Sequence, residues 1–199
     1  MVGDAIVSKL VGLGHAVMIG SREAGNPKAG AWAARVGGGA KAGAFPGAAQ
    51  FGELVFNCTN GANSIDALRA AGEEALADKT LMDVANVVPP EATGSESLGE
   101  KIQKIFPRLK VVKRLNTVNC HVMVDPSRIA ESHSMFLCGN DQGSKKMARS
   151  LLESFGGKIS SIWAKLPVPA QRKATWHSGS PSPRNWGSST SILRWSGNH

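Results

Sequence analysis

Ser21 and Arg22 are the residues whose types and spacing most directly predict binding chemistry. They close a short apolar run that begins at His15 and places Val17 and Ile19 at strand spacing. A hydroxyl and a guanidinium at the end of a strand can both donate hydrogen bonds to an anion. The pattern predicts a buried strand that delivers a cationic side chain to a ligand. The alternative is an exposed Ser-Arg pair that binds nothing.

This polar pair stands where a dinucleotide-binding fold recognises the adenosine ribose. The second strand of such a fold ends about 20 residues after a glycine-rich turn, and an acidic residue there accepts the 2′-hydroxyl of NAD. Ser21 and Arg22 can instead donate charge-assisted hydrogen bonds to a 2′-phosphate, worth about 1.5–3 kcal/mol each. The sequence therefore predicts NADP over NAD by about one to two powers of ten. Lys28, near the start of the next helix, can reach the same phosphate.

Helices and strands alternate along the chain. The pattern predicts helices over 3–14, 23–36, 63–77, 98–106 and 145–155, and strands over 15–22, 41–45, 53–58, 79–84, 110–115 and 134–138. Ser64 is the expected cap of the third helix. This alternation predicts an α/β fold, a Rossmann-like doubly wound and mostly parallel sheet with helices on both faces.

Small polar side chains follow several of the predicted strands: Ser21, Arg22, Asn57, Thr59, Asn86, Asn116 and Asn119. Ligands of doubly wound sheets bind at the carboxyl ends of the strands, where such side chains would line a cofactor cleft. The preference of Asn, Ser and Thr for turns accounts for about half of them.

The phosphate-binding turn at the start of the fold is incomplete. Gly3 stands in the position of the third glycine of G-x-G-x-x-G, whereas the first two glycines and the strand before them are absent. That first strand is the central one of the sheet, so the strands ending at Arg22 and Cys58 lose a shared neighbour. We expect either a start of translation upstream of Met1 or a damaged copy of the fold.

Composition excludes several classes of protein. The chain of 199 residues has no apolar run near 18 residues and no charged-then-apolar leader, so we expect a cytoplasmic protein without a membrane partner. Its three cysteines show no C-x-x-C spacing, and a metal site at Cys120-His121 is not expected because adjacent residues of a strand point apart. The expected partner is a small molecule, with a homodimer left open.

Successive blocks of the chain resemble the NADP oxidoreductases that depend on the deazaflavin coenzyme F420. The blocks keep their order and spacing over about residues 1 to 160: Met1–Gly3, Leu13–His15, Gly20–Arg22, Phe56–Thr59, Asp83–Asn86, Val112–Lys113, Leu115–Thr117 and Cys138–Asp141. The resemblance implies a Rossmann-like fold that exchanges a hydride between NADP(H) and a second redox partner, in this family the deazaflavin.

The resemblance also implies roles for individual residues. Ser21, Arg22 and Lys28 would contact the 2′-phosphate, and Met1 and Val2 would lie beside the pyrophosphate. Asn57 and Thr59 would lie along the nicotinamide half, and Ala85, Asn86 and Asn116 near the hydride-exchange face. Direct hydride transfer between two stacked rings needs no acid or base, so no catalytic residue is expected. The chain has two departures from the family, the absent glycine turn and a deazaflavin site that no residue marks.

Residues 163–199 differ in composition from the NADP-binding domain expected over residues 1–162. They hold four of the five tryptophans and five of the 23 basic residues, with no Asp or Glu. This predicts an irregular basic tail, and a frame shift near residue 160 would explain it. A genuine tail would permit binding of single-stranded nucleic acid, for which the basic residues are sparse. A protein that binds NADP without turnover is the other alternative.

Overall fold

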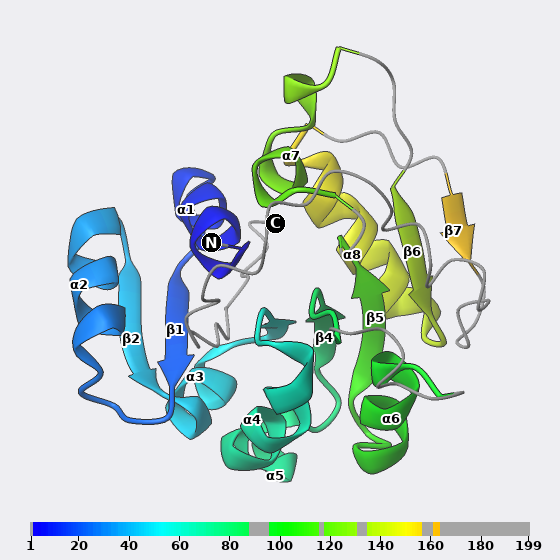
Figure 1. Ribbon diagram of the computed structural model, residues 1–199, viewed down its shortest axis with the longest axis horizontal. Coiled ribbons are helices and arrows are strands. Elements are labelled where there is room, and N and C mark those ends of the chain that lie inside the picture. The colour runs from blue at the N-terminus through cyan, green and yellow to red at the C-terminus, as the bar shows by residue number, and fades with distance from the viewer. Residues whose placement is uncertain (1, 88–95, 116–117, 131–134, 157–160, 164–199) are drawn as a thin grey trace.

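The computed structural model describes residues 2–87, 96–115, 118–130, 135–156 and 161–163 (Figure 1). Met1 and Asn116, two residues of the expected cofactor site, lie outside this part of the chain. The expected basic tail also lies outside it, except for Trp163.

The strands form a sheet of two and a sheet of five. In the smaller sheet, β1 (Val17–Ser21) pairs in parallel with β2 (Ala40–Ala44). The larger sheet has the order β3-β4-β5-β6-β7, with bounds Leu54–Asn57, Thr80–Asp83, Lys110–Arg114, Phe136–Gly139 and Ser161–Trp163. All of its pairs are parallel except β5–β6, which is antiparallel. The predicted α/β fold with a mostly parallel sheet is confirmed.

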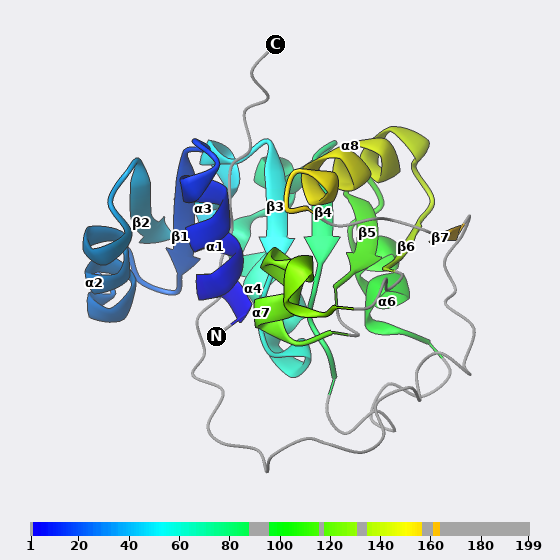
Figure 2. The same cartoon turned by 90° about the horizontal axis from the view of Figure 1, so that it is seen from above.

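Helices cover both faces of the strands (Figures 1 and 2). On one face lie α1 (Val2–Gly12), α2 (Pro27–Val36), α7 (Cys120–Val124) and α8 (Gln142–Glu153), whose apolar side chains share one core cluster. On the other face lie α3 (Phe45–Phe51), α4 (Ser64–Ala71), α5 (Glu73–Leu76) and α6 (Leu98–Ile105), which share a second cluster. The larger sheet is therefore buried on both faces, as its continuous apolar strands require.

Strand β3 shows how the chain supplies both clusters. Leu54 and Phe56 belong to the cluster under α1, and Val55 belongs to the cluster under α4. All three are 0% exposed. Successive side chains of a strand point to opposite faces, so a run without polar residues is what a strand covered twice needs.

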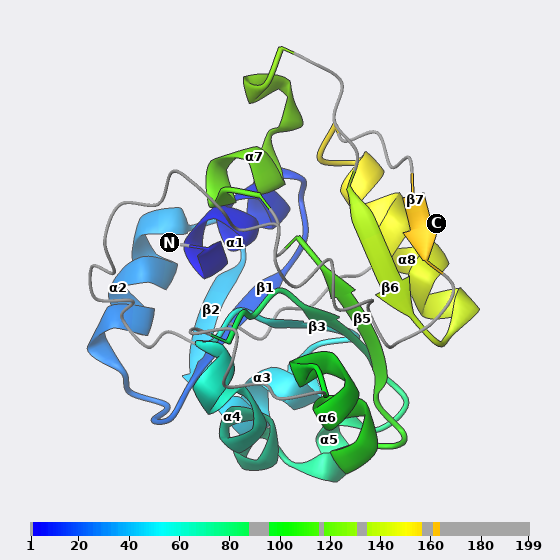
Figure 3. The same ribbon diagram turned by 45° about the vertical axis from the view of Figure 1, so that its right-hand side comes forward.

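Within the described residues, β1 and β3 belong to separate sheets and do not pair. This agrees with the expectation that the two strands lack a shared neighbour. The core nevertheless continues across the break, because Ile6 and Leu10 of α1 pack in one cluster with Val17 of β1 and Phe56 of β3. Helix α1 itself lies against β1 and α7 (Figure 3). Apolar side chains therefore join the two sheets where ladder hydrogen bonds do not.

Local chemistry moves several boundaries from their predicted positions. Helix α2 begins at Pro27 because the Asn26 side chain accepts hydrogen bonds from the next free amides, Lys28 N and Ala29 N, both at 3.1 Å. The helix predicted over 63–77 is two helices, α4 and α5, separated by Gly72 with φ of +94°. A backbone in this left-handed region ends a helix.

Two expectations about capping and strand geometry are wrong. Ser64 is the first residue of α4 rather than its cap, and its hydroxyl hydrogen-bonds to Asn57 at the end of β3 and to Thr59 in the turn that follows. Cys120 and His121 lie in α7 rather than on a strand, because the Asn119 side chain accepts the His121 amide and starts a helix. Helix α8 begins before the predicted Lys145, since Asp141 caps it through Ser144 N at 2.7 Å.

Candidate functional site

The carboxyl end of β1 carries the residues expected to bind a phosphate. Ser21 is 9% exposed, and its hydroxyl donates to the backbone carbonyl of Glu23. Arg22 follows in the turn with an exposed side chain, and exposed Lys28 lies in the first turn of α2. The structure thus presents two cations to solvent beside one strand end. The Ser21 hydroxyl is committed to a backbone oxygen and must rotate to donate elsewhere.

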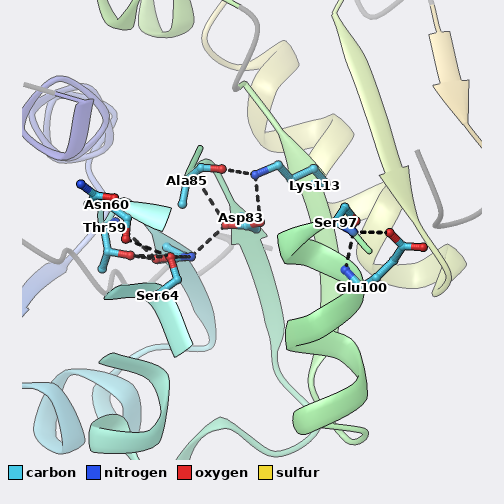
Figure 4. Close-up of polar contacts among 9 residues, drawn as sticks. Thr59, Asn60, Ser64, Asp83, Ala85, Ser97, Glu100 and Lys113 are labelled. Atoms are coloured by element: carbon cyan, nitrogen blue, oxygen red, sulfur yellow. Dashed lines mark hydrogen bonds and ion pairs between the residues drawn. The ribbon is translucent and has the colours of Figure 1, made fainter. Parts of the chain in front are cut away.

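The carboxyl ends of β3 and β4 carry a buried hydrogen-bond network (Figure 4). Asn57 Nδ2 donates to Asp83 Oδ1 at 2.8 Å and to Ser64 Oγ at 3.0 Å. Thr59 Oγ1 donates to Asn57 Oδ1 at 2.7 Å and lies 2.7 Å from Ser64 Oγ. These four side chains are 8% exposed or less. The network fixes the turn between β3 and α4 to the end of β4.

Asp83 is the centre of the charged part of this network. Its carboxylate is 0% exposed, and Lys113 Nζ of β5 donates to Oδ2 at 2.9 Å. The same ammonium donates to the Ala85 carbonyl, and Ala85 N donates to Asp83 Oδ1 at 3.2 Å. A buried carboxylate needs such a partner, because an unpaired one is strongly destabilising. Lys113 and Asp83 thereby tie Ala85, two residues after β4, to the ends of β4 and β5 (Figure 4).

The turns that follow β3 and β4 also meet through their backbones. Gly61 N donates to the Asn86 carbonyl oxygen at 3.1 Å. A Cβ on Gly61 would lie 2.6 Å from the carbonyl carbon and oxygen of Asn86 and 2.7 Å from Val87 N. Glycine is therefore required here for close approach of two chain segments.

The site residues expected near the nicotinamide differ in exposure. Asn57, Thr59 and Ala85 lie together at the carboxyl ends of the strands of the larger sheet and are buried, whereas Asn86 beside them is exposed. Val2 opens α1 and packs against the core while remaining partly exposed. Asn57, Thr59 and Ala85 are therefore covered by protein, and Asn86 is the one of these four that reaches solvent.

Cys58 lies among these residues without a nucleophilic role. Burial, and secondarily the charge of Asp83, raises the pKa of its thiol to about 12. The thiolate is the reactive form, so this cysteine is inert at neutral pH. Among the described residues there is no group of three or more His, Cys, Asp or Glu side chains suited to a metal ion. No helix in the same part of the chain has the length and apolarity to cross a membrane.

An open depression of about 660 Å³ lies at the amino-terminal ends of β4 and β5. Thr80 and Lys110, the first residues of these strands, line it together with Ser144 of α8. It is distant from the polar network at the strand ends. Ligands of parallel α/β sheets bind at the carboxyl ends of the strands, so we place the candidate site there.

The first 87 residues of the chain match the family model described as NADP oxidoreductase, coenzyme F420-dependent. A crystal structure from Arthrobacter sp. FB24, described as an F420-dependent NADP-reductase, is 37% identical in sequence with a TM-score of 0.78. That similarity covers 87% of this chain and 85% of the other. The chain belongs to the coenzyme F420-dependent NADP oxidoreductase family. Family membership places it among the NAD(P)-dependent oxidoreductases.

More distant structures share the fold of this F420-dependent oxidoreductase family member. A hypothetical protein from Sinorhizobium meliloti is 21% identical with a TM-score of 0.65, over 80% of this chain and 79% of the other. An imine reductase from Streptomyces aurantiacus is 22% identical with a TM-score of 0.58, over 80% of this chain and 51% of the other. No curated protein sequence matches the chain.

Sequence reasoning did not identify four residues that build the site of this family member: Gly61, Ser64, Asp83 and Lys113. Two of them leave a signal in the sequence. Asp83 ends a strand that is otherwise uncharged, and Lys113 follows two valines in β5, and a charge in a buried strand indicates a partner. The local sequence at Ser64 predicts only a helix cap, because its hydrogen bond to Asn57 spans the turn and leaves no local pattern.

Proposed function

We propose that this chain binds NADP(H) in preference to NAD(H) and exchanges a hydride between it and a second redox partner. The proposal rests chiefly on the exposed Arg22 at the carboxyl end of β1, beside a hydroxyl where NAD-specific folds carry a carboxylate. Arg22 and Lys28 would hold the 2′-phosphate, and Ser21 would join them after rotation. A guanidinium can pair with two phosphate oxygens at once.

The larger sheet would hold the nicotinamide half. Asn86 is exposed at the carboxyl edge, and the Gly61–Asn86 contact keeps its backbone in place. Asn57 and Thr59 are bonded to each other beneath this surface, so they would shape the cleft rather than donate to the ligand. Val2, at the start of α1, would lie beside the pyrophosphate together with Met1. Asn116 would complete the hydride-exchange face with Ala85.

The bound nicotinamide would supply the hydride chemistry, and this chain's residues would supply position. Direct transfer needs the two reacting carbons held about 3–3.5 Å apart with water excluded. The network of Asp83 and Lys113 suits this requirement, because it fixes the backbone at Ala85 by hydrogen bonds. The second redox partner would be a deazaflavin such as coenzyme F420, by likeness to the family. The proposed setting is the cytoplasm, and residues 1–162 would form the NADP-binding domain.

Calorimetric titration with NADPH and with NADH tests the proposal. We expect NADPH to bind about 10- to 100-fold more tightly than NADH, and Arg22→Ala to remove most of that difference. Arg69→Ala, which removes an exposed arginine from α4, is the matched control and should leave both affinities unchanged. Equal affinities for the two nucleotides in the unaltered chain would contradict the assignment of the phosphate site.

Hydride transfer is tested separately. Oxidation of NADPH followed at its absorbance band, with a reducible deazaflavin as acceptor, should proceed in the unaltered chain and slow in Arg22→Ala. Binding of NADPH without turnover of any acceptor would favour a protein that only binds the nucleotide.

A further inference from the structure

Arg114, the last residue of β5, is a buried cation that the proposed function does not use. It is 0% exposed and is among the largest fully buried side chains of the described chain. Its Nε, Nη1 and Nη2 atoms have no hydrogen-bond partner among the residues that the structure describes. A guanidinium carries five N–H donors, and buried donors are almost always paired. A fully buried guanidinium without such partners therefore requires an explanation.

The charge of Arg114 persists at neutral pH. Burial lowers the pKa of the guanidinium to about 9, with Glu153 acting in the opposite direction. The Glu153 carboxylate is engaged elsewhere, since it accepts from Arg149 Nε at 2.8 Å on the surface of α8. A positive charge is therefore held inside the protein, with its opposing charge turned toward solvent. An anion that reached the guanidinium would meet unsatisfied donors.

The position of Arg114 fits a ligand site. Side chains two apart on a strand share a face, so Arg114 lies on the same face as Val112, which packs in one cluster with Leu151 and Leu152 of α8. Lys113, its neighbour, serves the network on the opposite face. Arg114 ends its strand at the carboxyl edge that also carries Asn57 and Asp83. Ligands of this class of sheet bind at that edge.

We propose that Arg114 forms an anion subsite, which takes a phosphate or carboxylate group of the second redox partner. The guanidinium fork matches two oxygens of either group. The identity of the ligand rests on the proposed function, whereas anion binding itself does not. Because the side chain is fully covered, the anion must displace packing at the end of β5, so association should be slow.

Thermal unfolding in the presence of inorganic phosphate tests the subsite. The unaltered chain also carries Arg22 and Lys28, so the measurement is made in an Arg22→Ala, Lys28→Ala background. We expect phosphate at about ten times its dissociation constant to raise the midpoint by about 3–6 °C. Adding Arg114→Met, which keeps the length and removes the charge, should raise the midpoint without phosphate and abolish the response to phosphate.

A matched control separates this site from surface cations. Arg149→Met removes an arginine from the exposed side of α8 and should keep the full phosphate response. Arg114→Lys, which keeps the charge and loses the fork, should retain a weakened response and serves where Arg114→Met does not fold. No phosphate response in the parent background, or an equal response after Arg114→Met, would overturn the subsite.

Competition between inorganic phosphate and NADPH shows which ligand supplies the anion at Arg114. The measurement uses the chain with Arg22 and Lys28 intact. Phosphate binding at Arg114 that persists at saturating NADPH supports the second redox partner as the source. Displacement of that phosphate by NADPH would mean that a phosphate of the cofactor occupies Arg114, which overturns the assignment to the partner. A failure of NADPH to bind would refute the proposed function and leave the phosphate result for Arg114 standing.

Discussion

The two sheets differ at the carboxyl ends of their strands. Arg22, directly after β1, reaches solvent, whereas hydrogen bonds join Asn57 of β3 to Asp83 of β4, and Asp83 to Lys113 of β5. Arg22 is exposed, and so is Lys28 at the start of α2. Asn57 and Asp83, by contrast, are 2% and 0% exposed and share hydrogen bonds. The cations beside the smaller sheet are therefore accessible to a ligand, whereas Asn57 and Asp83 of the larger sheet stabilise the fold.

Because of this difference, some substitutions should change ligand affinity and others the free energy of unfolding. Removing an exposed cation takes a contact from the ligand and almost nothing from the fold, since such surface changes are usually within about 0.5 kcal/mol. Removing a member of the buried network leaves its partner unsatisfied in the interior. Substitutions in the two sheets should therefore change different measurable quantities.

The largest expected effect is that of Lys113→Met, which leaves the buried Asp83 carboxylate unpaired. We expect a loss of about 3–5 kcal/mol in the free energy of unfolding, measured by urea denaturation. Arg149→Met breaks an exposed ion pair of similar length and should cost about 0.5 kcal/mol or less. Adding Asp83→Asn to Lys113→Met should restore part of the loss. A cost for Lys113→Met no greater than that of Arg149→Met would refute the role of the network.

Gly61→Ala should have the next largest effect, because the added Cβ would meet the backbone of Asn86 at 2.6 Å. We expect a loss of about 1–3 kcal/mol in the free energy of unfolding, with weaker NADPH binding. The control is Gly30→Ala in α2, where a Cβ meets no atom within 4 Å among the described residues. That change should stabilise the protein by about 0.5–1 kcal/mol. Equal effects of the two substitutions would contradict the close approach.

Alkaline pH should lower the free energy of unfolding because the Cys58 thiol ionises more readily in the unfolded chain. Its pKa is about 12 in the folded protein against 9.0 for an ordinary thiol, so the unfolded chain releases this proton first as pH rises. Stability from this group is complete below about pH 9 and is lost above it. We expect the unaltered chain to lose about 1 kcal/mol more than Cys58→Ala between pH 9 and pH 10, measured by urea denaturation. Parallel pH profiles of the two proteins would show that folding does not raise the pKa of this thiol.

Lys28→Ala should change affinity alone. One exposed ammonium contributes less to a phosphate than a guanidinium fork, so we expect NADPH binding to weaken by about three- to tenfold. The free energy of unfolding should stay within about 0.5 kcal/mol. Calorimetric titration and urea denaturation of the same preparation check both. A loss of stability comparable to that of Gly61→Ala would remove the distinction between the two sheets.

The elements of the fold could be predicted because their signals are local. Strand β3 differs from its prediction by one residue at each end, since an apolar run between polar residues defines a buried strand. The separation of β1 from β3 agrees with the expectation that these two strands lack a shared neighbour. The antiparallel direction of β6 could not be predicted, because strand direction depends on the path of the chain between β5 and β6.

The site could be predicted only in part. The structure places Arg22 exposed directly after β1, as its sequence context predicts, and its role toward a phosphate stays a prediction. Ser64 has a cap-like sequence context, yet its hydroxyl bonds to Asn57 and Thr59. The pairing of Asp83 with Lys113 depends on two strands lying side by side in register, which sequence spacing does not determine.

The break between β1 and β3 would give the proposed nucleotide a mechanical role. If the adenosine end rests on one sheet and the nicotinamide end on the other, the bound molecule spans the only seam that ladder hydrogen bonds leave open in the described part of the chain. Each sheet can then open as its own cooperative unit. Without NADPH, the amide hydrogens of β1 and β2 should exchange faster than those of β3 and β4. Bound NADPH would contact both sheets, so the exchange rates of the two sheets should then become similar.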